Sequence, residues 1–183
     1  MRIRSRTAGL LLAAAAAAGL TAAVTPPAGA STGPAGYYKL LIRVAVGAPI
    51  MCLQPADPAG GPGTAVVQQP CAAVQAQNWA PLSISGTSYR FLNQASGLCM
   101  DVAGGAASGT PVDQWPCNSI SNERWSWPHS FPDSFWPIRS QVAGSTSYCL
   151  DVPGASTQAG LGVQIYRCNN TAAQAWAIAG PVT

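Results

Sequence analysis

The sequence predicts an all-β fold of three similar lobes, each made of four short strands. Three observations indicate this fold. A pattern of two cysteines and one tryptophan recurs three times, short runs of strand character alternate with Gly, Pro and Ser clusters, and no amphipathic helical stretch of useful length follows residue 30. The length of 183 residues suits a single folded domain.

The composition excludes several classes of protein. Charged residues make up only 8% of the chain, against roughly 25% in an ordinary soluble domain, while the hydrophobic share of 48% is average. Disordered segments lack apolar residues that can be buried, whereas the six tryptophans and six cysteines of this chain are spread along its length. We therefore expect a folded domain with a dispersed core.

Residues 1–30 are typical of a secretory signal peptide. Three arginines precede an uncharged run rich in Leu and Ala, and the small-residue triplet Ala28-Gly29-Ala30 offers a cleavage site. A transmembrane anchor is the alternative, because the run approaches the roughly 20 residues that span a bilayer. The weakly apolar alanines and the cleavage site favour secretion to the extracellular space, with residues 31–36 as a short linker and no membrane insertion after cleavage.

Cleavage would change the charge of the protein. Removing three of the nine Lys and Arg leaves six of each sign, so the formal net charge falls from +3 to zero. The remaining basic residues are scattered along the chain. Nucleic-acid binding depends on clustered Lys and Arg, and we therefore expect none.

The spacing of cysteine and tryptophan defines the lobes, at about 37–84, 85–132 and 133–183. Within a copy the cysteines lie 19, 18 and 19 positions apart, and the tryptophan follows the second cysteine by 8 positions. The three copies are Cys52, Cys71 and Trp79; Cys99, Cys117 and Trp125; and Cys149, Cys168 and Trp176.

Each lobe opens with an aromatic-led apolar segment, at residues 38–42, 89–92 and 135–138. Three copies are too few for a propeller, and a linear solenoid would need polar end caps. A closed threefold arrangement satisfies the edge strands better. The three recurring tryptophans are expected in its core, because of their size and fixed spacing.

Six cysteines in an exported chain indicate three disulfides, and no C-x-x-C spacing suggests a zinc site. Fifteen pairings are possible. If each copy is the same structural unit, its two cysteines should pair with each other. Each bond would then close a loop of about 20 residues and stabilise the fold by roughly 3 kcal/mol.

Three motifs resemble the ricin B-type lectin repeat. They are the C-L-D-V opening at residues 149–152, with C-M-D-V at 99–102, the aromatic-x-C-N segment, and the closing Q-x-W. The resemblance implies a β-trefoil, with a six-stranded barrel capped by three hairpins and one shallow sugar pocket possible in each lobe. It also implies disulfides within lobes. We expect no cofactor.

The resemblance further implies which positions bind the sugar. A carboxylate at the C-x-D position accepts two hydroxyl hydrogen bonds, a ring two residues before the second cysteine covers the apolar face of the sugar, and an amide before Q-x-W both donates and accepts. The second lobe fits this rule with Asp101, Trp115 and Asn122. It departs from the rule at Asp113 and Glu123, where glutamine is usual, so its pocket should be more acidic and prefer a differently hydroxylated sugar.

The other lobes match less well. The third has Asp151, Gln164 and Tyr166, but Ala173 replaces the amide, which Asn169 would have to supply. The first has none of the expected contacts, with glutamine at positions 54 and 69 and alanine at 76, and is predicted to be structural. For both aspartates, stabilising a local turn is the alternative to sugar binding.

These features predict a secreted lectin without enzymatic activity that binds galactose- or xylose-like units of extracellular polysaccharide or glycoprotein, as a monomer. A protein-interaction or inhibitor β-trefoil with vestigial pockets is the alternative. His129 lies near Ser130 and Asp133, but the segment is broken by proline and no oxyanion motif accompanies it, so a catalytic triad is not expected.

Overall fold

The computed structural model describes residues 36–127 and 135–182. The predicted signal peptide and residues 31–35 of the predicted linker lie outside the described residues, as do His129, Ser130 and Asp133. Within the two described ranges, no helix is long and apolar enough to cross a membrane.

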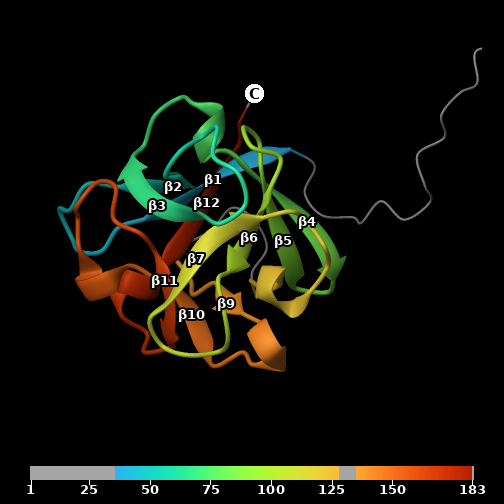
Figure 1. The fold of residues 1–183 in the computed structure, drawn as a ribbon. Helices are drawn as coiled ribbons and strands as arrows, with labels where there is room; N and C mark the ends of the chain where they lie inside the picture. Colours follow the sequence, from blue (N-terminus) through green and yellow to red (C-terminus); the bar gives the residue numbers. More distant parts are fainter. Residues whose placement is uncertain (1–35, 128–134, 183) are drawn as a thin grey trace, which may run out of the picture. The chain divides into compact units, whose positions relative to one another are not determined.

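The described residues form twelve strands and five short 3-10 helices, and the predicted all-β fold of three four-stranded repeats is confirmed (Figure 1). The first lobe contains β1 (Tyr37–Ile42), β2 (Met51–Pro55), β3 (Thr64–Pro70), η1 (Gln75–Gln77) and β4 (Trp79–Ser85). The second contains β5 (Ser88–Asn93), β6 (Cys99–Val102), β7 (Thr110–Trp115), η2 (Ser121–Glu123) and β8 (Trp125–Ser126). The third contains β9 (Arg139–Ser140), η3 (Val142–Gly144), β10 (Tyr148–Asp151), η4 (Pro153–Ala155), β11 (Gln164–Arg167), η5 (Ala172–Gln174) and β12 (Trp176–Val182).

The first and last strands of each lobe build a barrel. Antiparallel pairing runs from β12 to β1, then to β4, β5, β8 and β9. A bridge between Trp136, just before β9, and Trp176 of β12 closes the ring, with backbone hydrogen bonds of 2.8 and 2.9 Å in the two directions. Closure leaves no long strand edge among these elements, which is how barrels avoid edge-to-edge association.

The two inner strands of each lobe form a hairpin, and the three hairpins cap the barrel. The hairpins are β2–β3, β6–β7 and β10–β11. Strand β7 also pairs with β3 and with β11, and a bridge between Val67 and Gly162 joins the remaining two hairpins. Each hairpin therefore contacts both of the others.

The same tryptophan position is buried in the core in each of the three lobes. Trp79, Trp125 and Trp176 are completely buried, as predicted from their spacing. Each indole Nε1 donates to a backbone carbonyl of its own lobe's first hairpin strand, at 2.9, 3.1 and 2.8 Å respectively. The polar edge of the ring is thus satisfied inside an apolar core, which a buried tryptophan requires.

The predicted disulfide pairing is confirmed in every lobe. The bonds are Cys52–Cys71, Cys99–Cys117 and Cys149–Cys168. Each bond joins a cysteine in the first strand of a hairpin to a cysteine shortly after its second strand. The bond therefore links the two ends of the hairpin that carries the predicted site.

The turn glycines of the hairpins connect neighbouring lobes. Gly63, Gly109 and Gly160 all have positive φ, at 86°, 89° and 78°, which side-chain-bearing residues rarely adopt. Each donates its N–H to a carbonyl of a neighbouring hairpin: Gly63 to Gln114 at 2.8 Å, Gly109 to Ile165 at 2.9 Å, and Gly160 to Gln68 at 2.8 Å.

Candidate functional site

The outward face of the second-lobe hairpin carries a hollow of about 280 Å³. Asp101 of β6 lies directly opposite Asp113 of β7, and Trp115 lies opposite Cys99. Because side chains alternate along a strand, Asp113 and Trp115 share the outward face, while Gln114 between them is completely buried. The residues lining the hollow are Asp101, Val102, Ala103, Gly104, Asp113, Trp115, Ile120 and Asn122.

The ring and the amide border the same hollow as the carboxylates. Trp115 is 43% exposed, unlike the core tryptophans, and so offers its face to a ligand. Asn122 donates through Nδ2 to the carbonyls of Val102 and Gly104, at 2.8 and 3.1 Å. These two bonds hold the turn after β6 against η2 and use both amide hydrogens, so Oδ1 is the atom of Asn122 that a ligand would contact.

Glu123 lies behind the hollow rather than along its wall. Its side chain is completely buried, and its carboxylate accepts the backbone N–H of Asn118 at 2.9 and 3.1 Å and that of Ser119 at 3.1 Å. The equivalent Gln77 and Gln174 likewise accept the N–H of Ala72 and Asn169, at 2.7 and 2.9 Å. This position shapes the segment after the second cysteine, a local backbone role.

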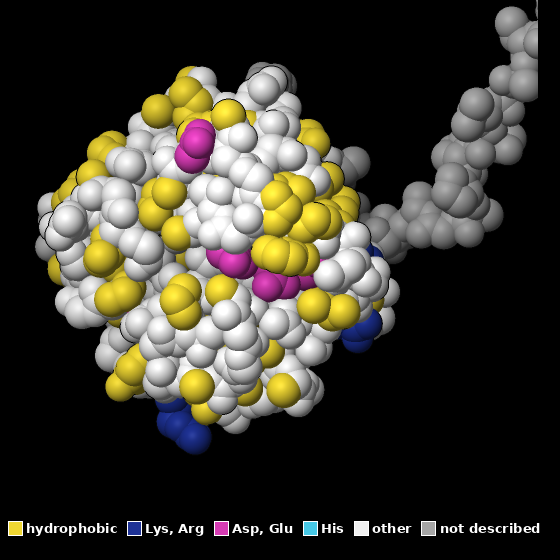
Figure 2. Space-filling model, in the orientation of Figure 1, with side chains coloured by type: hydrophobic (Ala, Val, Ile, Leu, Met, Phe, Trp, Pro, Cys, Tyr) yellow, Lys and Arg dark blue, Asp and Glu magenta, His cyan; other side chains and the backbone are white. Residues whose placement is uncertain are grey.

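Negative charge is concentrated in the second-lobe hollow. Figure 2 shows acidic side chains gathered over β6 and β7 beside hydrophobic ones, with Lys and Arg only at the edge of that face. Burial, and then repulsion from Asp113 and Glu123, raise the pKa of Asp101 from 3.8 to about 7. Burial also raises the pKa of Asp113. The pair therefore retains a proton at a pH where ordinary carboxyls are ionised.

The third lobe carries the equivalent hollow, of about 370 Å³, lined by Asp151, Gln164, Tyr166 and Asn169 among others. Asp151 lies opposite Gln164, and Tyr166 is 42% exposed. Both oxygens of Asp151 are hydrogen-bonded, Oδ1 to Nε2 of Gln164 at 2.8 Å and Oδ2 to Nε2 of Gln174 at 3.0 Å.

Asn169 reaches the third-lobe hollow from the residue after Cys168. Its Oδ1 accepts the N–H of Thr171 at 3.1 Å and the hydroxyl of Thr171 at 2.8 Å. The acceptor side of the amide is therefore engaged in a local turn. The Nδ2 group is the part that remains for a ligand, so this amide would donate where that of Asn122 would accept.

The first lobe retains a hollow but not the side chains. The cavity of about 520 Å³ includes Gln54, Gln69 and Ala76 at the three equivalent positions, and neither a carboxylate nor an aromatic ring is among its lining residues. Gln54 accepts a hydrogen bond from Nε2 of Gln77 at 3.0 Å, as Asp151 does from Gln174. The first and third lobes thus share this local hydrogen bond, while the first lobe lacks the side chains that would recognise a sugar.

Several residues that line the hollows were not predicted from the sequence. Ile120 and Thr171 each lie three residues after the second cysteine of their lobe and border the second-lobe and third-lobe hollows. The fixed distance from the cysteine is the signal that could have identified them. Residues of the turns at 103–104 and 154–155 also line the hollows, and their small side chains form no recognisable motif.

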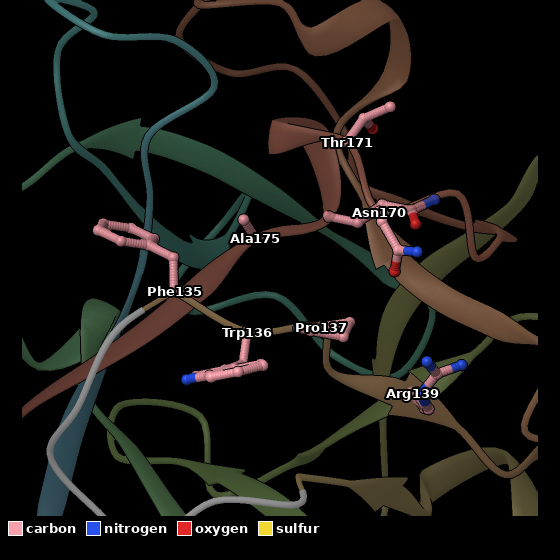
Figure 3. A pocket seen from close by; sticks show the side chains of 8 residues that line it. Phe135, Trp136, Pro137, Arg139, Asn170, Thr171 and Ala175 are labelled. Atoms are coloured by element: carbon pink, nitrogen blue, oxygen red, sulfur yellow. The ribbon is translucent and has the colours of Figure 1, made fainter.

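A further hollow of about 430 Å³ lies outside these equivalent positions. Figure 3 shows Phe135, Trp136 and Pro137, from the segment before β9, on one side and Asn170 and Thr171, which lead into η5, on the other. The backbone of Trp136 pairs with Trp176 of β12, so this side of the hollow is attached to the barrel.

Comparisons with known proteins agree with the geometry. The model of the family "Ricin-type beta-trefoil lectin domain-like" matches residues 25–115 and 82–147. No curated protein matches the chain.

Solved structures share the fold. A designed threefold-symmetric protein, ThreeFoil, is similar with 23% identity and a TM-score of 0.70, covering 79% of this chain and 99% of its own. The ricin B-like lectin of Macrolepiota procera, solved with lactose, has 20% identity and a TM-score of 0.62, with 82% and 99% covered. An exo-β-1,3-galactanase from Clostridium thermocellum has 23% identity and a TM-score of 0.64, with 79% of this chain and only 30% of the galactanase covered.

The family match spans more than half of the chain, and the designed threefold protein covers 79% of it. The repeat of cysteine, aspartate and tryptophan that resembled the ricin B-type pattern thus has the architecture of that family. The chain belongs to the ricin-type β-trefoil lectin domain-like family.

Proposed function

We propose that the protein is a secreted, non-enzymatic lectin that binds galactose- or xylose-like units through the hollows of its second and third lobes. One observation carries this proposal. In both lobes an aspartate and an exposed aromatic ring border the same hollow, and in the first lobe both are missing from an otherwise similar frame. A role in stabilising the turn would not require the ring to disappear together with the carboxylate.

The arrangement suits the surface of a pyranose. Its C–H face can pack on Trp115 or Tyr166, and adjacent hydroxyls can donate to the carboxylate opposite. The hollows are small, at about 280 and 370 Å³, so we expect each to bind weakly by itself. Two such sites on one rigid frame would strengthen binding to a polymer by raising the effective concentration of the second unit.

Galactose as the first sugar to test is supported by the Macrolepiota procera lectin, which was solved with lactose. The galactanase is an enzyme, but the present chain covers only 30% of it, and its activity is not proposed for this chain.

A glycan array probed with the purified protein tests the proposal. Single variants Asp101→Ala and Asp151→Ala should each weaken binding, and the double variant should abolish it. The matched control is Gln69→Ala, which changes the ring position of the first lobe and should leave binding unchanged. Absence of binding to any glycan, or binding that survives the double variant, would contradict the proposal.

Protein recognition is the alternative, and the exposed rings of Phe135 and Trp136 favour it. Competition separates the two functions. Free galactose or xylose should elute the protein from a sugar-bearing polymer but leave a protein partner bound, and a Trp136→Ala variant should weaken only the second interaction.

A further inference from the structure

The second-lobe and third-lobe hollows share a frame but differ in the groups that face their aspartate. In the third lobe Asp151 receives one amide hydrogen on each oxygen, from Gln164 and Gln174. Its negative charge is therefore met by two donors before any ligand arrives. This is the usual condition for a buried carboxylate, because an unmet charge in a low-dielectric site is costly.

In the second lobe both amides are replaced by acids. Asp113 occupies the strand position of Gln164, as the pairings Asp101–Asp113 and Asp151–Gln164 show. Glu123 occupies the position of Gln174, and its carboxylate oxygens accept hydrogen bonds from backbone N–H groups. An ionised carboxylate has no hydrogen to donate, so Asp101 lacks both of the donors that its counterpart has.

One oxygen of each buried carboxylate is consequently left without a hydrogen-bond partner. Asp101 and Asp113 are only 6% and 8% exposed, and Oδ2 of the first and Oδ1 of the second have no hydrogen-bond partner and no contact with solvent. The residues that line the hollow include no Lys or Arg. The nearest basic side chain in sequence, Arg124, donates to the carbonyl of Ser119 instead. Once the pair has lost its proton, the hollow therefore presents uncompensated negative charge beside an exposed indole ring.

We propose that the second-lobe hollow selects a sugar that carries a free, protonated amine, such as a 2-amino-2-deoxyhexose unit. This proposal rests on the proposed lectin function and assigns a substrate class to one of its two sites. The ammonium group would lie against Asp101 and Asp113, while the C–H face of the sugar packs on Trp115. An ammonium group supplies both the positive charge and the hydrogen-bond donors that Gln164 and Gln174 supply in the third lobe.

A metal ion fits the same charge less well. Calcium takes six to eight oxygen ligands, whereas Glu123 is already bound to backbone and only two carboxylates face the hollow. No group of three His, Cys, Asp or Glu side chains suited to a metal occurs among the described residues. The exposed ring further favours an organic cation, because indole attracts a cation as well as a sugar face.

The proton balance gives the proposal a pH signature. The raised pKa of Asp101, about 7, means that the empty pair holds a proton near neutral pH, and the arriving ammonium group would displace it. The facing titratable groups are Asp101 on β6, Asp113 on β7 and Glu123 on η2. Preference for the amine should therefore increase from pH 5.5 to pH 7.5 and decrease again once the amine itself loses its proton.

Isothermal titration with galactosamine, galactose and N-acetylgalactosamine tests the proposal. The Tyr166→Ala background removes the ring of the third lobe, so that the measurement reports the second. We expect galactosamine to bind about tenfold more tightly than galactose at pH 7.5 and low salt, because a hydrogen bond between charged groups is worth that much or more. Acetylation of the amine should remove the preference, and added salt should reduce it.

The decisive variant is Asp113→Gln, which restores the amide found in the third lobe and should bring the galactosamine-to-galactose affinity ratio close to one. The matched control Gln69→Ala should keep the ratio. Equal affinities for the two sugars, or a ratio that Asp113→Gln leaves intact, would overturn the amine proposal while leaving the lectin function standing. A preference that EDTA abolishes, or an equal affinity for Nα-acetyl-lysine, would also overturn it, in favour of a metal or a protein ligand. Failure of all three sugars together with an empty glycan array would instead count against the lectin function itself.

Discussion

Replacing Glu123 by glutamine should stabilise the protein above neutral pH. This holds even though the change removes a buried carboxylate that accepts three hydrogen bonds from the backbone N–H groups of Asn118 and Ser119. The structure of the third lobe gives the reason. There the equivalent Gln174 accepts the N–H of Asn169 through Oε1 and donates through Nε2 to Asp151 at 3.0 Å. In the variant, Oε1 can keep the N–H of Asn118 while Nε2 supplies Asp101 with a donor.

The magnitude follows from the bonds exchanged. A hydrogen bond to a charged group contributes about 1.5–3 kcal/mol, and the N–H of Ser119 loses its acceptor at a cost of roughly 1 kcal/mol. The net gain should be about 1–2 kcal/mol at pH 8. For a domain of this size that corresponds to an increase of a few degrees in Tm.

The gain should depend on pH with a defined sign. The carboxyl of Asp101 has a raised pKa of about 7, so below pH 5 it is protonated in the folded protein and needs no donor. The difference between variant and wild type should therefore be small at pH 4.5 and grow as the pH passes through 7. Urea unfolding of the oxidised protein at pH 4.5 and pH 8 measures it.

The matched control is Gln174→Glu, which takes the donor away from Asp151 and should destabilise the third lobe by a similar amount at pH 8. A Glu123→Gln variant that is less stable than the wild type at pH 8, or equally stabilised at both pH values, would refute the reasoning. Either result would mean that Asp101 does not lack a donor in the folded protein.

Three further predictions concern stability and binding. The free energy of unfolding of the wild type should fall by about 1–2 kcal/mol between pH 4 and pH 7, because the raised pKa of Asp101 stabilises the fold only while the carboxyl keeps its proton. The full pKa shift corresponds to about 4 kcal/mol, and solvent in the open hollow reduces this value. Urea titrations over this range should show the fall, and Asp101→Asn should flatten it. Trp115→Ala should abolish second-lobe sugar binding with little loss of stability, whereas Trp125→Ala should cost about 3–5 kcal/mol, so a matched pair of calorimetric melts would contradict us if the two variants unfolded alike. Replacing Cys99 and Cys117 by serine should lower the free energy of unfolding in urea by about 3 kcal/mol. An unchanged unfolding midpoint would show that this disulfide does not stabilise the fold.

The sequence was most informative where one physical requirement repeats. A tryptophan must be buried and bonded once in each lobe, and two cysteines must meet at the base of each hairpin, so spacing alone located the core and the disulfides. Asp101 and Trp115 border one hollow, and their positions were inferred from the resemblance to the ricin B-type repeat rather than from spacing. That they bind a sugar stays a prediction.

The sequence could not show how the acids divide their roles. Asp113 and Glu123 both replace glutamine, yet only Asp113 faces the hollow, while Glu123 is enclosed by backbone N–H groups. That difference depends on how the segment after Cys117 folds back, which a local pattern does not encode. The missing donors of Asp101 become visible only when the second and third lobes are superimposed through their strand pairings.

The hydrogen bonds of the turn glycines limit how such a protein can be divided. Gly63, Gly109 and Gly160 each donate a backbone hydrogen bond to a neighbouring hairpin rather than to their own. The three bonds link the first hairpin to the second, the second to the third and the third to the first. Excising one lobe would leave a donor and an acceptor exposed at the cut, together with two open barrel edges. An isolated lobe should therefore fold only by assembling with two copies of itself, which together would supply the missing backbone partners and close the barrel.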